Sequence, residues 1–552
     1  MNNHQKPFGN IALGLSGGGY RATAFHLGTL DFLEYVGILR DVSMISTVSG
    51  GTFTGARYAL SQADGKSFKE FFEGFYRELV STHLPSLWLQ ELNAAKESET
   101  PHGIKLIKSA ANVYNKHLFN NAKFGQLFDA APNIHLKEII FNATEFDNGL
   151  VFRFQCSNGG QIGNGKISLP QEVAKEMRIA DIVATSSCFP GGFEPMVFPD
   201  DYFSPTEYKQ ISGKLSQSLI SKLPVALMDG GVDDNQGVQS LIIANERIGA
   251  QIQKGKPTQT EELGLLIVSD TDNIQSSAED IFHPSSYINT EKAGAPKRSN
   301  DLTLNKLVFL SRVFRGFLYL LPFLLLAQIL SDIVQHKFDV FEILFVGIPL
   351  LLSVTVAGFI GVLFNQFRGK VLPSLQENLQ KQLGVSLWDT VQNLTLDEAL
   401  NMVEIRISSL LALPTVFMKR IRSLVSQNLF SNLKYRDKVI SNYIYDLEKS
   451  RCKKFESYQL KEPSEQMQKL SQSCTNMETT LWFRLGEEKQ QLNQVISCGQ
   501  VTMCFNLLEY ILKYKADKIG QDPVVTEVWN KSKEAWELMQ NDPEALITRY
   551  EL

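Results

Sequence analysis

The sequence predicts an α/β protein with a central, largely parallel sheet between layers of helices. Its main support is that an apolar strand, a glycine-rich turn and a helix follow one another twice between residues 9 and 61, which is the element order of a parallel α/β sheet. Composition agrees, since 43% of the 552 residues are apolar and 20% are charged, as in globular chains with a large core. The formal net charge of −5 gives no reason to expect nucleic acid as a partner.

The first strand is expected at residues 9–15, followed by a glycine loop and a helix at 22–36. The second strand, at 42–48, leads through Ser49-Gly50-Gly51 into a helix at 52–61. Further strands are predicted at 138–142, 150–155, 224–228 and 263–268, and further helices at 67–80 and 172–184. No repeat of fixed period is present, which argues against solenoids and propellers.

Two long apolar segments distinguish the middle of the chain. No charged residue lies between Arg315 and Asp332 or between Glu342 and Arg368, and a polar link at 335–339 joins the two segments. A helix of about 20 apolar residues crosses a hydrocarbon core of about 30 Å. We therefore expect a two-helix transmembrane hairpin, with helices at about 316–334 and 340–364. The alternative is a pair of buried core helices in a soluble domain.

The hairpin divides the sequence into three predicted parts: a catalytic core at 1–305, the hairpin at 306–370, and a mostly helical region at 371–552 that packs on the core. In the last part, helical spacing of apolar residues is seen at 398–411, 439–447 and 501–512. This region carries no obvious chemistry.

Charges around the hairpin predict its orientation. Lys337 is the one cation in the connecting turn, whereas five cations flank the hairpin: Lys306, Arg312, Arg315, Arg368 and Lys370. Because cytoplasmic flanks are enriched in Lys and Arg, we expect the catalytic core to be cytoplasmic on an inner or cytoplasmic membrane. The start of the sequence lacks an apolar signal region, so attachment is expected from inside the chain. Six scattered cysteines without a Cys-x-x-Cys pair predict a reducing compartment.

Ser49 stands between a predicted buried strand and a helix and is followed by two glycines. This is the order of a nucleophile elbow, in which the serine occupies a strained turn and small neighbours let the helix pass close to the strand. In Thr47-Val48-Ser49-Gly50-Gly51, a threonine replaces the first glycine of the usual motif. Ser-Gly-Gly also forms ordinary turns, so a serine without chemistry is the alternative.

Three glycines, Gly17-Gly18-Gly19, follow the first strand, and Arg21 comes two residues later. Successive glycines leave backbone N–H groups free to point at one spot, as a tetrahedral oxyanion requires, and an arginine adds positive charge. The expected oxyanion and substrate-binding residues are Gly17, Gly18, Gly19, Arg21 and Gly50. A phosphate-cradling loop is the alternative, but no Gly-Lys-Ser/Thr follows, and the dinucleotide fingerprint is matched only weakly.

Asp229-Gly230-Gly231 follows the apolar segment at 224–228. Its carboxylate would lie at the C-terminal end of a strand, at the edge where Ser49 is expected in a parallel sheet, and there it can accept the serine proton. An aspartate before two glycines is often only a turn former, which is the alternative reading of this motif.

The glycine loop, Ser49 and Asp229, in this order, resemble the patatin-like phospholipases of the bacterial type. Residues 16–22 are also similar to the glycine loop of the related cytosolic phospholipases. Residues 184–190 resemble the small-residue and proline segment of the family, and Asn142-Ala143-Thr144 resembles a strand of bacterial members. The resemblance covers residues 9 to about 240. Thr47 departs from the family pattern, as does Ser16, where many patatins have aspartate.

The resemblance implies a patatin-like three-layer α/β/α core and a catalytic dyad of Ser49 and Asp229, with the oxyanion site at the glycine loop. A Ser-Asp-His triad is the rival mechanism, because His283 follows Asp229 in the chain order of an α/β-hydrolase. A histidine beside a proline in a polar segment is more often a surface residue. His26 is expected to pack or cap, and the adjacent Asp233 and Asp234 are expected to form a loop.

The expected function is a membrane-anchored phospholipase A-type hydrolase that cleaves fatty-acyl esters without a metal or other cofactor. Membrane phospholipid or another acyl lipid is the expected substrate, and the bilayer is the expected partner. The sequence leaves open whether the chain forms homo-oligomers. An acyltransferase or general carboxylesterase is the alternative among enzymes, and a non-catalytic patatin-like membrane scaffold is the alternative among other classes.

Overall fold

The computed structural model describes residues 5–97, 105–190, 192–271, 420–425, 427–449, 452–477, 482–484 and 486–552, together with the single residues 320, 327, 330, 331 and 334. The chain divides into two compact units. One contains residues 1–276 and 414–552, and the other contains residues 277–413. Almost all of the described residues belong to the first unit, and the account below concerns that unit.

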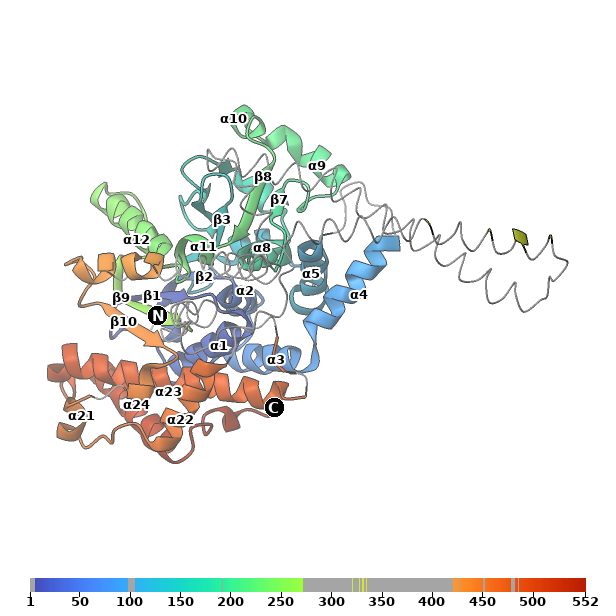
Figure 1. The fold of residues 1–552 in the computed structure, drawn as a ribbon. Helices are drawn as coiled ribbons and strands as arrows, with labels where there is room; N and C mark the ends of the chain where they lie inside the picture. Colours follow the sequence, from blue (N-terminus) through green and yellow to red (C-terminus); the bar gives the residue numbers. More distant parts are fainter. Residues whose placement is uncertain are drawn as a thin grey trace, which may run out of the picture. The chain divides into compact units, whose positions relative to one another are not determined.

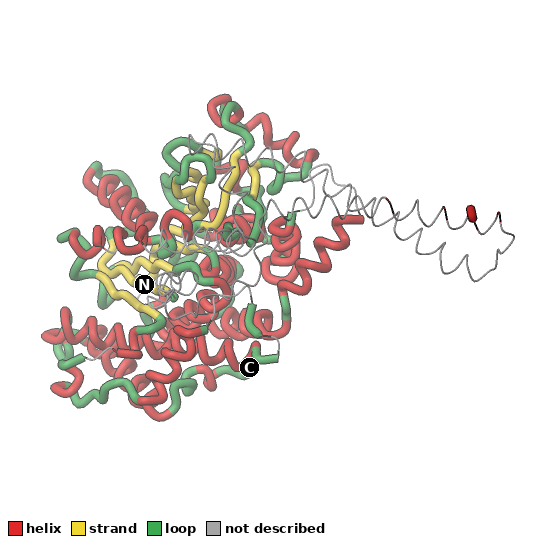
Figure 2. The backbone as a smooth tube through the Cα atoms, viewed as in Figure 1, coloured by secondary structure: helices red, strands yellow, loops and turns green. Residues whose placement is uncertain are grey.

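In the described part of the chain, ten strands form one sheet (Figures 1 and 2). The strands are β1 (Asn10–Leu15), β2 (Val42–Val48), β3 (Glu138–Glu145), β4 (Leu150–Cys156), β5 (Ile162–Gly163), β6 (Ser168–Leu169), β7 (Met196–Phe198), β8 (Val225–Asp229), β9 (Leu263–Asp270) and β10 (Val439–Tyr443). The five strands β10-β9-β1-β2-β3 are parallel in this order. β4 is antiparallel to β3, and β5 and β6 continue that antiparallel edge. The predicted α/β fold with a largely parallel sheet is confirmed.

The helices fall before, between and after the strands. In the core they are α1 (Gly19–Tyr35), α2 (Gly50–Ala63), α3 (Phe68–Ser81), α4 (Leu84–Glu97), α5 (Leu106–Tyr114), α6 (Gly125–Ala130), α7 (Gln171–Ala174), α8 (Ile179–Ser187), α9 (Pro205–Ile211), α10 (Gln217–Ile220), α11 (Gly231–Asp234) and α12 (Val238–Gln253). The C-terminal part adds α20 (Asp446–Lys449), α21 (Lys454–Ser457), α22 (Glu465–Asn476), α23 (Glu488–Tyr514) and α24 (Pro523–Asn541).

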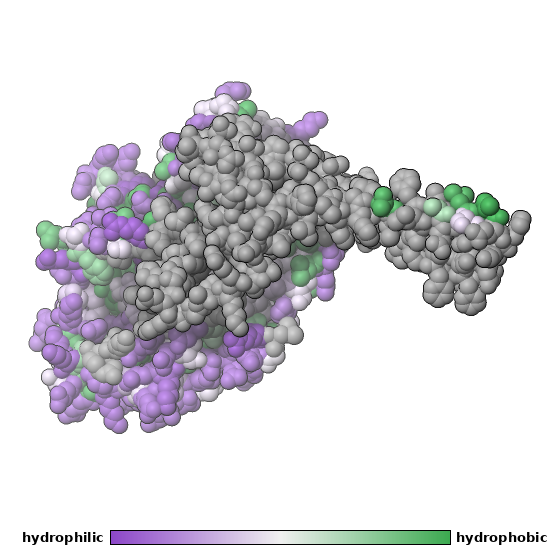
Figure 3. All heavy atoms as spheres, in the orientation of Figure 1, coloured by the Kyte–Doolittle hydropathy of each residue, from purple (hydrophilic) through white to green (hydrophobic). Residues whose placement is uncertain are grey.

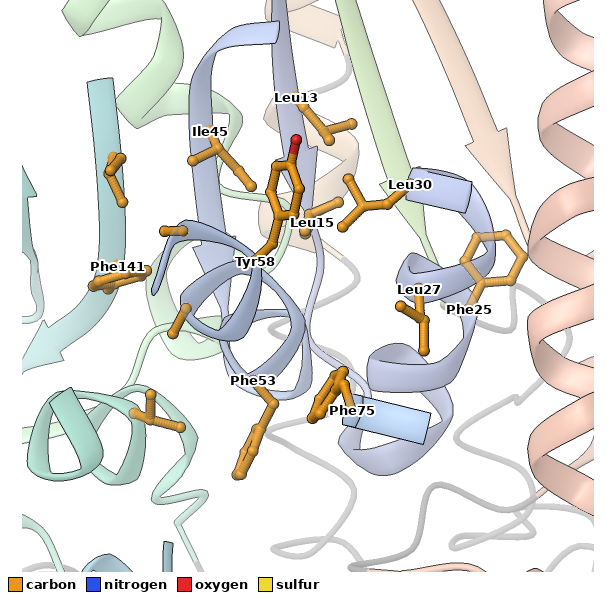
Figure 4. Close-up of a cluster of buried hydrophobic side chains, with 14 of the residues drawn as sticks. Leu13, Leu15, Phe25, Leu27, Leu30, Ile45, Phe53, Tyr58, Phe75 and Phe141 are labelled. Carbon is orange, nitrogen blue, oxygen red and sulfur yellow. The ribbon is translucent and has the colours of Figure 1, made fainter. Parts of the chain in front are cut away.

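Alternate side chains of the central strands pack on opposite faces of the sheet. In β1, Leu13 and Leu15 join the larger hydrophobic cluster with α1 and α2, whereas Ala12 joins a second cluster with α12. Figure 4 shows Leu13, Leu15 and Ile45 of the strands together with side chains of α1, such as Leu30, and of α2, such as Tyr58, in the larger cluster. Because both faces are covered, the central strands β1, β2 and β3 are buried along their whole length, as expected for a parallel sheet between two helical layers.

Two expected helices are wrong in detail. Residues 439–447 begin as strand β10, which pairs in parallel with β9 and extends the core sheet. The helix expected at 172–184 is interrupted, because the backbone of Met177 and Ile179 bonds to Phe124 and Ala122. Short segments with mixed periodicity can become strand or helix, and here partners far along the chain decide the outcome.

Helix α23 is the longest helix among the described residues and packs along α1. It is long and apolar enough to cross a membrane by length and composition, but 94% of that apolar stretch is buried inside the protein. The two helices cross where glycines face backbone: a Cβ on Gly28 would lie 2.0 Å from the carbonyl oxygen of Ile496, and one on Gly499 would lie 2.2 Å from that of Phe25. Helix α23 is therefore part of the core.

A buried carboxylate, Asp31 on α1, also ties the C-terminus to the core. It accepts hydrogen bonds from Gln500 at 2.6 Å and from Arg549 at 2.7 Å, and it also bonds to the hydroxyl of Tyr550. Burial raises the pKa of this carboxyl, and the partners offset that shift. Figure 3 shows mainly hydrophilic side chains on the outer surface of the C-terminal helices, so their apolar faces point inward.

The transmembrane hairpin at 306–370 and the helical spacing at 398–411 lie outside the described residues. The five single residues described in the hairpin region are helical and exposed, and they include Leu320, Leu330 and Val334. The hairpin and the boundaries of the three predicted parts stay predictions.

The close crossing of α1 and α23 leads to a stability prediction. Gly499→Ala should lower the free energy of unfolding by about 1–3 kcal/mol, because the added methyl meets rigid backbone. Gly74→Ala is the matched control: Gly74 lies in α3 with no atom within 4 Å of an added Cβ, so the change should raise stability by about 0.5–1 kcal/mol. Thermal melts of the full chain in detergent would measure both, and equal effects would contradict the proposed crossing.

Candidate active site

The ends of β2 and β8 meet along one edge of β3. β2 runs parallel to β3 and ends with Val48 opposite Asn142, while β8 runs antiparallel to β3 and ends with Asp229 opposite Ala143. Because Asn142 and Ala143 are consecutive, Ser49 and Asp229 arrive at the same point from opposite directions. The expected meeting of these residues is thus seen, but an antiparallel strand brings Asp229 there, where a parallel one was expected.

Ser49 lies in a sharp turn between β2 and α2. Its φ of 49° and ψ of −119° are strained for a residue with a side chain, as in a nucleophile elbow. The turn depends on the two following glycines, because a Cβ on Gly50 would lie 2.0 Å from the carbonyl oxygen of Gly19, and one on Gly51 would lie 2.5 Å from that of Leu15. Only glycine lets α2 begin this close to the glycine loop.

Thr47, which replaces the usual glycine of the elbow, is accommodated by a glycine elsewhere. A Cβ on Gly55, in the second turn of α2, would lie 2.4 Å from the Cγ2 methyl of Thr47. The facing helix therefore has a glycine at the position where the threonine methyl group needs space. The threonine hydroxyl donates a 3.0 Å hydrogen bond to Thr52 of α2. The departure from the motif leaves the elbow geometry intact.

Asp229 is buried at the end of β8 and accepts a hydrogen bond from the Ser49 hydroxyl. Its Oδ1 also accepts the backbone N–H of Gly231 at 2.7 Å. Burial raises the pKa of Asp229 to about 6, and the two hydrogen bonds work against that rise. The glycine pair is needed here, because a Cβ on Gly230 would lie 2.5 Å from the carbonyl oxygen of Asn142.

The glycine loop lies against the elbow, with an ideal Cβ on Gly17 only 3.1 Å from the Cβ of Ser49. The N–H of Gly17 donates to the carbonyl oxygen of Asn235 at 3.0 Å and is therefore taken, contrary to its expected role as an oxyanion donor. Gly18 and Gly19 have positive φ values of 142° and 61°, and Gly19 begins α1. Because the first N–H groups of a helix lack intrahelical acceptors, Gly18 and Gly19 become the loop's candidate donors.

Arg21 points to a set of backbone carbonyls. The buried guanidinium donates to the carbonyl oxygens of Thr271 at 2.9 Å, Thr475 at 3.0 Å and Met477 at 2.6 Å. Burial is the main cause that lowers the pKa of Arg21. These bonds join α1 to the C-terminal end of α22 and to the residue after β9, and they do not favour the expectation that this cation binds the oxyanion.

The other candidates hold structure around the site. Burial lowers the pKa of His26 to about 4, and its ring contacts the carbonyl oxygen of Ser16 at 2.9 Å and the hydroxyl of Ser269 at 3.0 Å. The Asp234 carboxylate accepts backbone N–H groups of the next turn. Burial, and to a smaller extent the neighbouring negative charge of Asp234, raises the pKa of Asp233 to about 6. His283 lies outside the described residues.

Ser186, at the end of α8, is a site residue that the sequence reading did not single out. Its hydroxyl accepts the backbone N–H of Ser49 at 3.0 Å and donates to the carbonyl oxygen of Asn142 at 2.6 Å. In the sequence, the resemblance of residues 184–190 to a family segment is the one signal that points to this part of the site. The hydrogen bonds of the Ser186 hydroxyl could be identified only from the three-dimensional structure.

Comparison with known proteins finds one protein family and several solved structures that are similar to parts of this chain. Residues 13–242 match the family described as patatin-like phospholipase. Among solved structures, human GIVD cytosolic phospholipase A2 in complex with methyl gamma-linolenyl fluorophosphonate matches at 18% identity and a TM-score of 0.25, over 32% of this chain and 29% of that one. Human GIVD cytosolic phospholipase A2 matches at 14% identity and a TM-score of 0.31, over 54% and 49%. The chain spans less than half the length of these structures. No curated protein matches.

The α/β fold places Ser49 at a strand-to-helix turn, which is the position of the serine in a nucleophile elbow. The match over residues 13–242 indicates a patatin-like phospholipase domain in this part of the chain. The predicted resemblance to the patatin-like phospholipases is confirmed over residues 13–242, whereas the roles of Ser49, Asp229 and the glycine loop stay predictions.

The burial of Asp229 predicts the acid limb of the pH profile. A general base must be ionised, so kcat/KM should fall about tenfold per pH unit below the Asp229 pKa of about 6 and be level above it. Hydrolysis of an uncharged ester between pH 4.5 and 8 would measure this limb. Asp229→Asn should lower the rate by at least about a hundredfold at every pH. If Asp229→Asn kept the wild-type rate and the same fall in kcat/KM at acidic pH, Asp229 would be excluded as the general base.

Proposed function

We propose that the protein is a membrane-anchored lipid acyl hydrolase of the phospholipase A type, with Ser49 as nucleophile and Asp229 as general base. The observation that supports the proposal most is the meeting of β2 and β8 on β3, which ends both strands at neighbouring positions and leaves the Ser49 side chain close enough to lower the pKa of the buried Asp229 carboxyl. A strained serine with a carboxylate acceptor is the arrangement of an activated nucleophile.

The reaction consists of two acyl transfers. Asp229 takes the proton of Ser49 while the serine oxygen attacks the ester carbonyl, and the N–H groups of Gly18 and Gly19, with the start of α2 at Gly50, stabilise the oxyanion. The alkoxide leaving group departs with the proton held by Asp229. Water then attacks the acyl-enzyme, Asp229 accepts its proton, and the fatty acid is released as Ser49 recovers its hydrogen. No metal or cofactor enters these steps.

Lipid is the proposed substrate and the bilayer the proposed partner, because residues 306–370 carry two apolar segments long enough for a hairpin. A tethered catalytic unit meets its substrate at a high effective concentration. On this proposal the catalytic unit is cytoplasmic. An acyltransferase or carboxylesterase would use the same dyad and differ only in the acceptor or the ester, and a non-catalytic scaffold would leave Ser49 unreactive.

Removal of the nucleophile tests the chemistry. Ser49→Ala should abolish both labelling by a fluorophosphonate probe and fatty-acid release from mixed liposomes, because one oxygen carries the covalent route. Mass spectrometry of the liposome products would also separate hydrolysis from acyl transfer. An unlabelled wild-type protein would favour the scaffold, and a folded variant with normal turnover would exclude Ser49.

The membrane proposal predicts the accessibility of the turn at residue 336. A cysteine replacing His336 should react with an impermeant maleimide from the side opposite the catalytic unit, because five flanking cations favour a cytoplasmic location for both ends of the hairpin. The protein should also stay with membranes in alkaline carbonate. Labelling of residue 336 from the cytoplasmic side alone, or complete release by carbonate, would contradict a spanning hairpin.

A further inference from the structure

We propose that Ser186 is a positioning residue for the nucleophile, the acceptor in a chain of hydroxyl groups that replaces the missing first glycine of the elbow. The proposal rests on the proposed role of Ser49. Ser186 lies at the C-terminal end of α8 with its side chain fully buried, and its hydroxyl contacts three different elements. It does not touch the reacting atoms, so its effect on the reaction must pass through Ser49.

Donor and acceptor chemistry fixes the direction of every bond in this chain. The carbonyl oxygen of Asn142 can only accept, so the single hydroxyl proton of Ser186 is donated to it at 2.6 Å. The two lone pairs of Ser186 then accept the backbone N–H of Ser49 at 3.0 Å and the hydroxyl proton of Thr52 at 2.8 Å. Thr52 accepts in turn from Thr47 at 3.0 Å. Each of the three hydroxyl protons therefore has an acceptor, and the bond from Ser186 to Asn142 leaves Thr52 as the donor to Ser186.

This chain holds the strained turn. Ser49 precedes the first turn of α2, so its N–H has no intrahelical acceptor, and Ser186 supplies one while φ stays at 49°. Without that acceptor, the peptide of Ser49 loses a bond that favours the strained conformation. The series of hydroxyl hydrogen bonds starts at Thr47, the position where this sequence departs from the usual elbow. A hydrogen-bonded threonine thus stands in the place of a flexible glycine.

Ser186 also reaches the second member of the dyad. Its backbone carbonyl oxygen accepts the N–H of Gly230 at 3.3 Å, and the carbonyl oxygen of Cys188, two residues later, accepts the N–H of Asp229 at 3.3 Å. The end of α8 is thus bonded to the nucleophile on one side and to the base on the other. Small changes in the separation of such groups change the rate strongly, because the reacting geometry is narrow.

Ser186→Ala in the full chain tests the proposal, with Ser187→Ala as matched control. The Ser187 hydroxyl lies one residue further on the same helix but donates to the helix carbonyls of Val183 and Ala184. Ser186→Ala should lower the fluorophosphonate labelling rate and kcat by about ten- to a hundredfold while KM changes by less than about twofold. Ser187→Ala should leave both rates within about twofold.

The outcomes separate this inference from the proposed function. A wild-type protein that is not labelled refutes the proposed nucleophile, whereas labelled wild type with equal rates for both alanine variants refutes only the role of Ser186. If circular dichroism shows that Ser186→Ala does not fold, Thr52→Val becomes the test, because it removes the hydroxyl that donates to Ser186 and should lower kcat several-fold at unchanged KM. A KM effect without a kcat effect would also overturn the proposal.

Discussion

The reversal of the chain at Ser49 is the constraint on which the rest of the site depends. A side chain at φ 49° is held only where the surroundings determine the backbone, and here they consist of backbone atoms at very short range. The carbonyl oxygens of Leu15 and Gly19 exclude any Cβ from Gly51 and Gly50. The glycine loop, the elbow and the start of α2 therefore form one packed arrangement, and none of them can shift alone.

The C-terminal part supports this arrangement from the other side of α1. The crossing of α1 and α23 at two glycines brings the two helix backbones close together, and the buried Asp31 adds three polar bonds to the same helix. Arg21, in the first turn of α1, is bonded to carbonyl oxygens at the C-terminal end of α22. Because α1 begins at the glycine loop, the C-terminal helices help to set the position of the candidate oxyanion donors.

The sequence was sufficient for the parts of the fold that depend on local pattern. The strands before the glycine loop and before Ser49 were predictable, since apolar runs ended by glycines have few other uses in an α/β chain. The orientation of β8 was not, because a five-residue strand pairs equally well in either direction and its partner, β3, is distant in the sequence. The pairing of β10 with β9 and the carbonyl partners of Arg21 also join residues that are far apart in the sequence. The sequence alone therefore could not predict them.

Burial of Asp229 links the chemistry of the site to the stability of the fold. A carboxylate in water is a weak base, and removal from water strengthens it by raising the pKa to about 6. The same shift lowers the stability of the folded state at neutral pH. At low pH the carboxyl is protonated in both the folded and the unfolded state, so its burial as an ion costs nothing. Above pH 6 it is ionised in both states, and this lowers the free energy of unfolding by about 3 kcal/mol. The hydrogen bonds from Ser49 and the Gly231 N–H limit that cost. A fold that keeps so unfavourable a group at a strained serine requires the dense support that β3, α8 and the glycine loop provide.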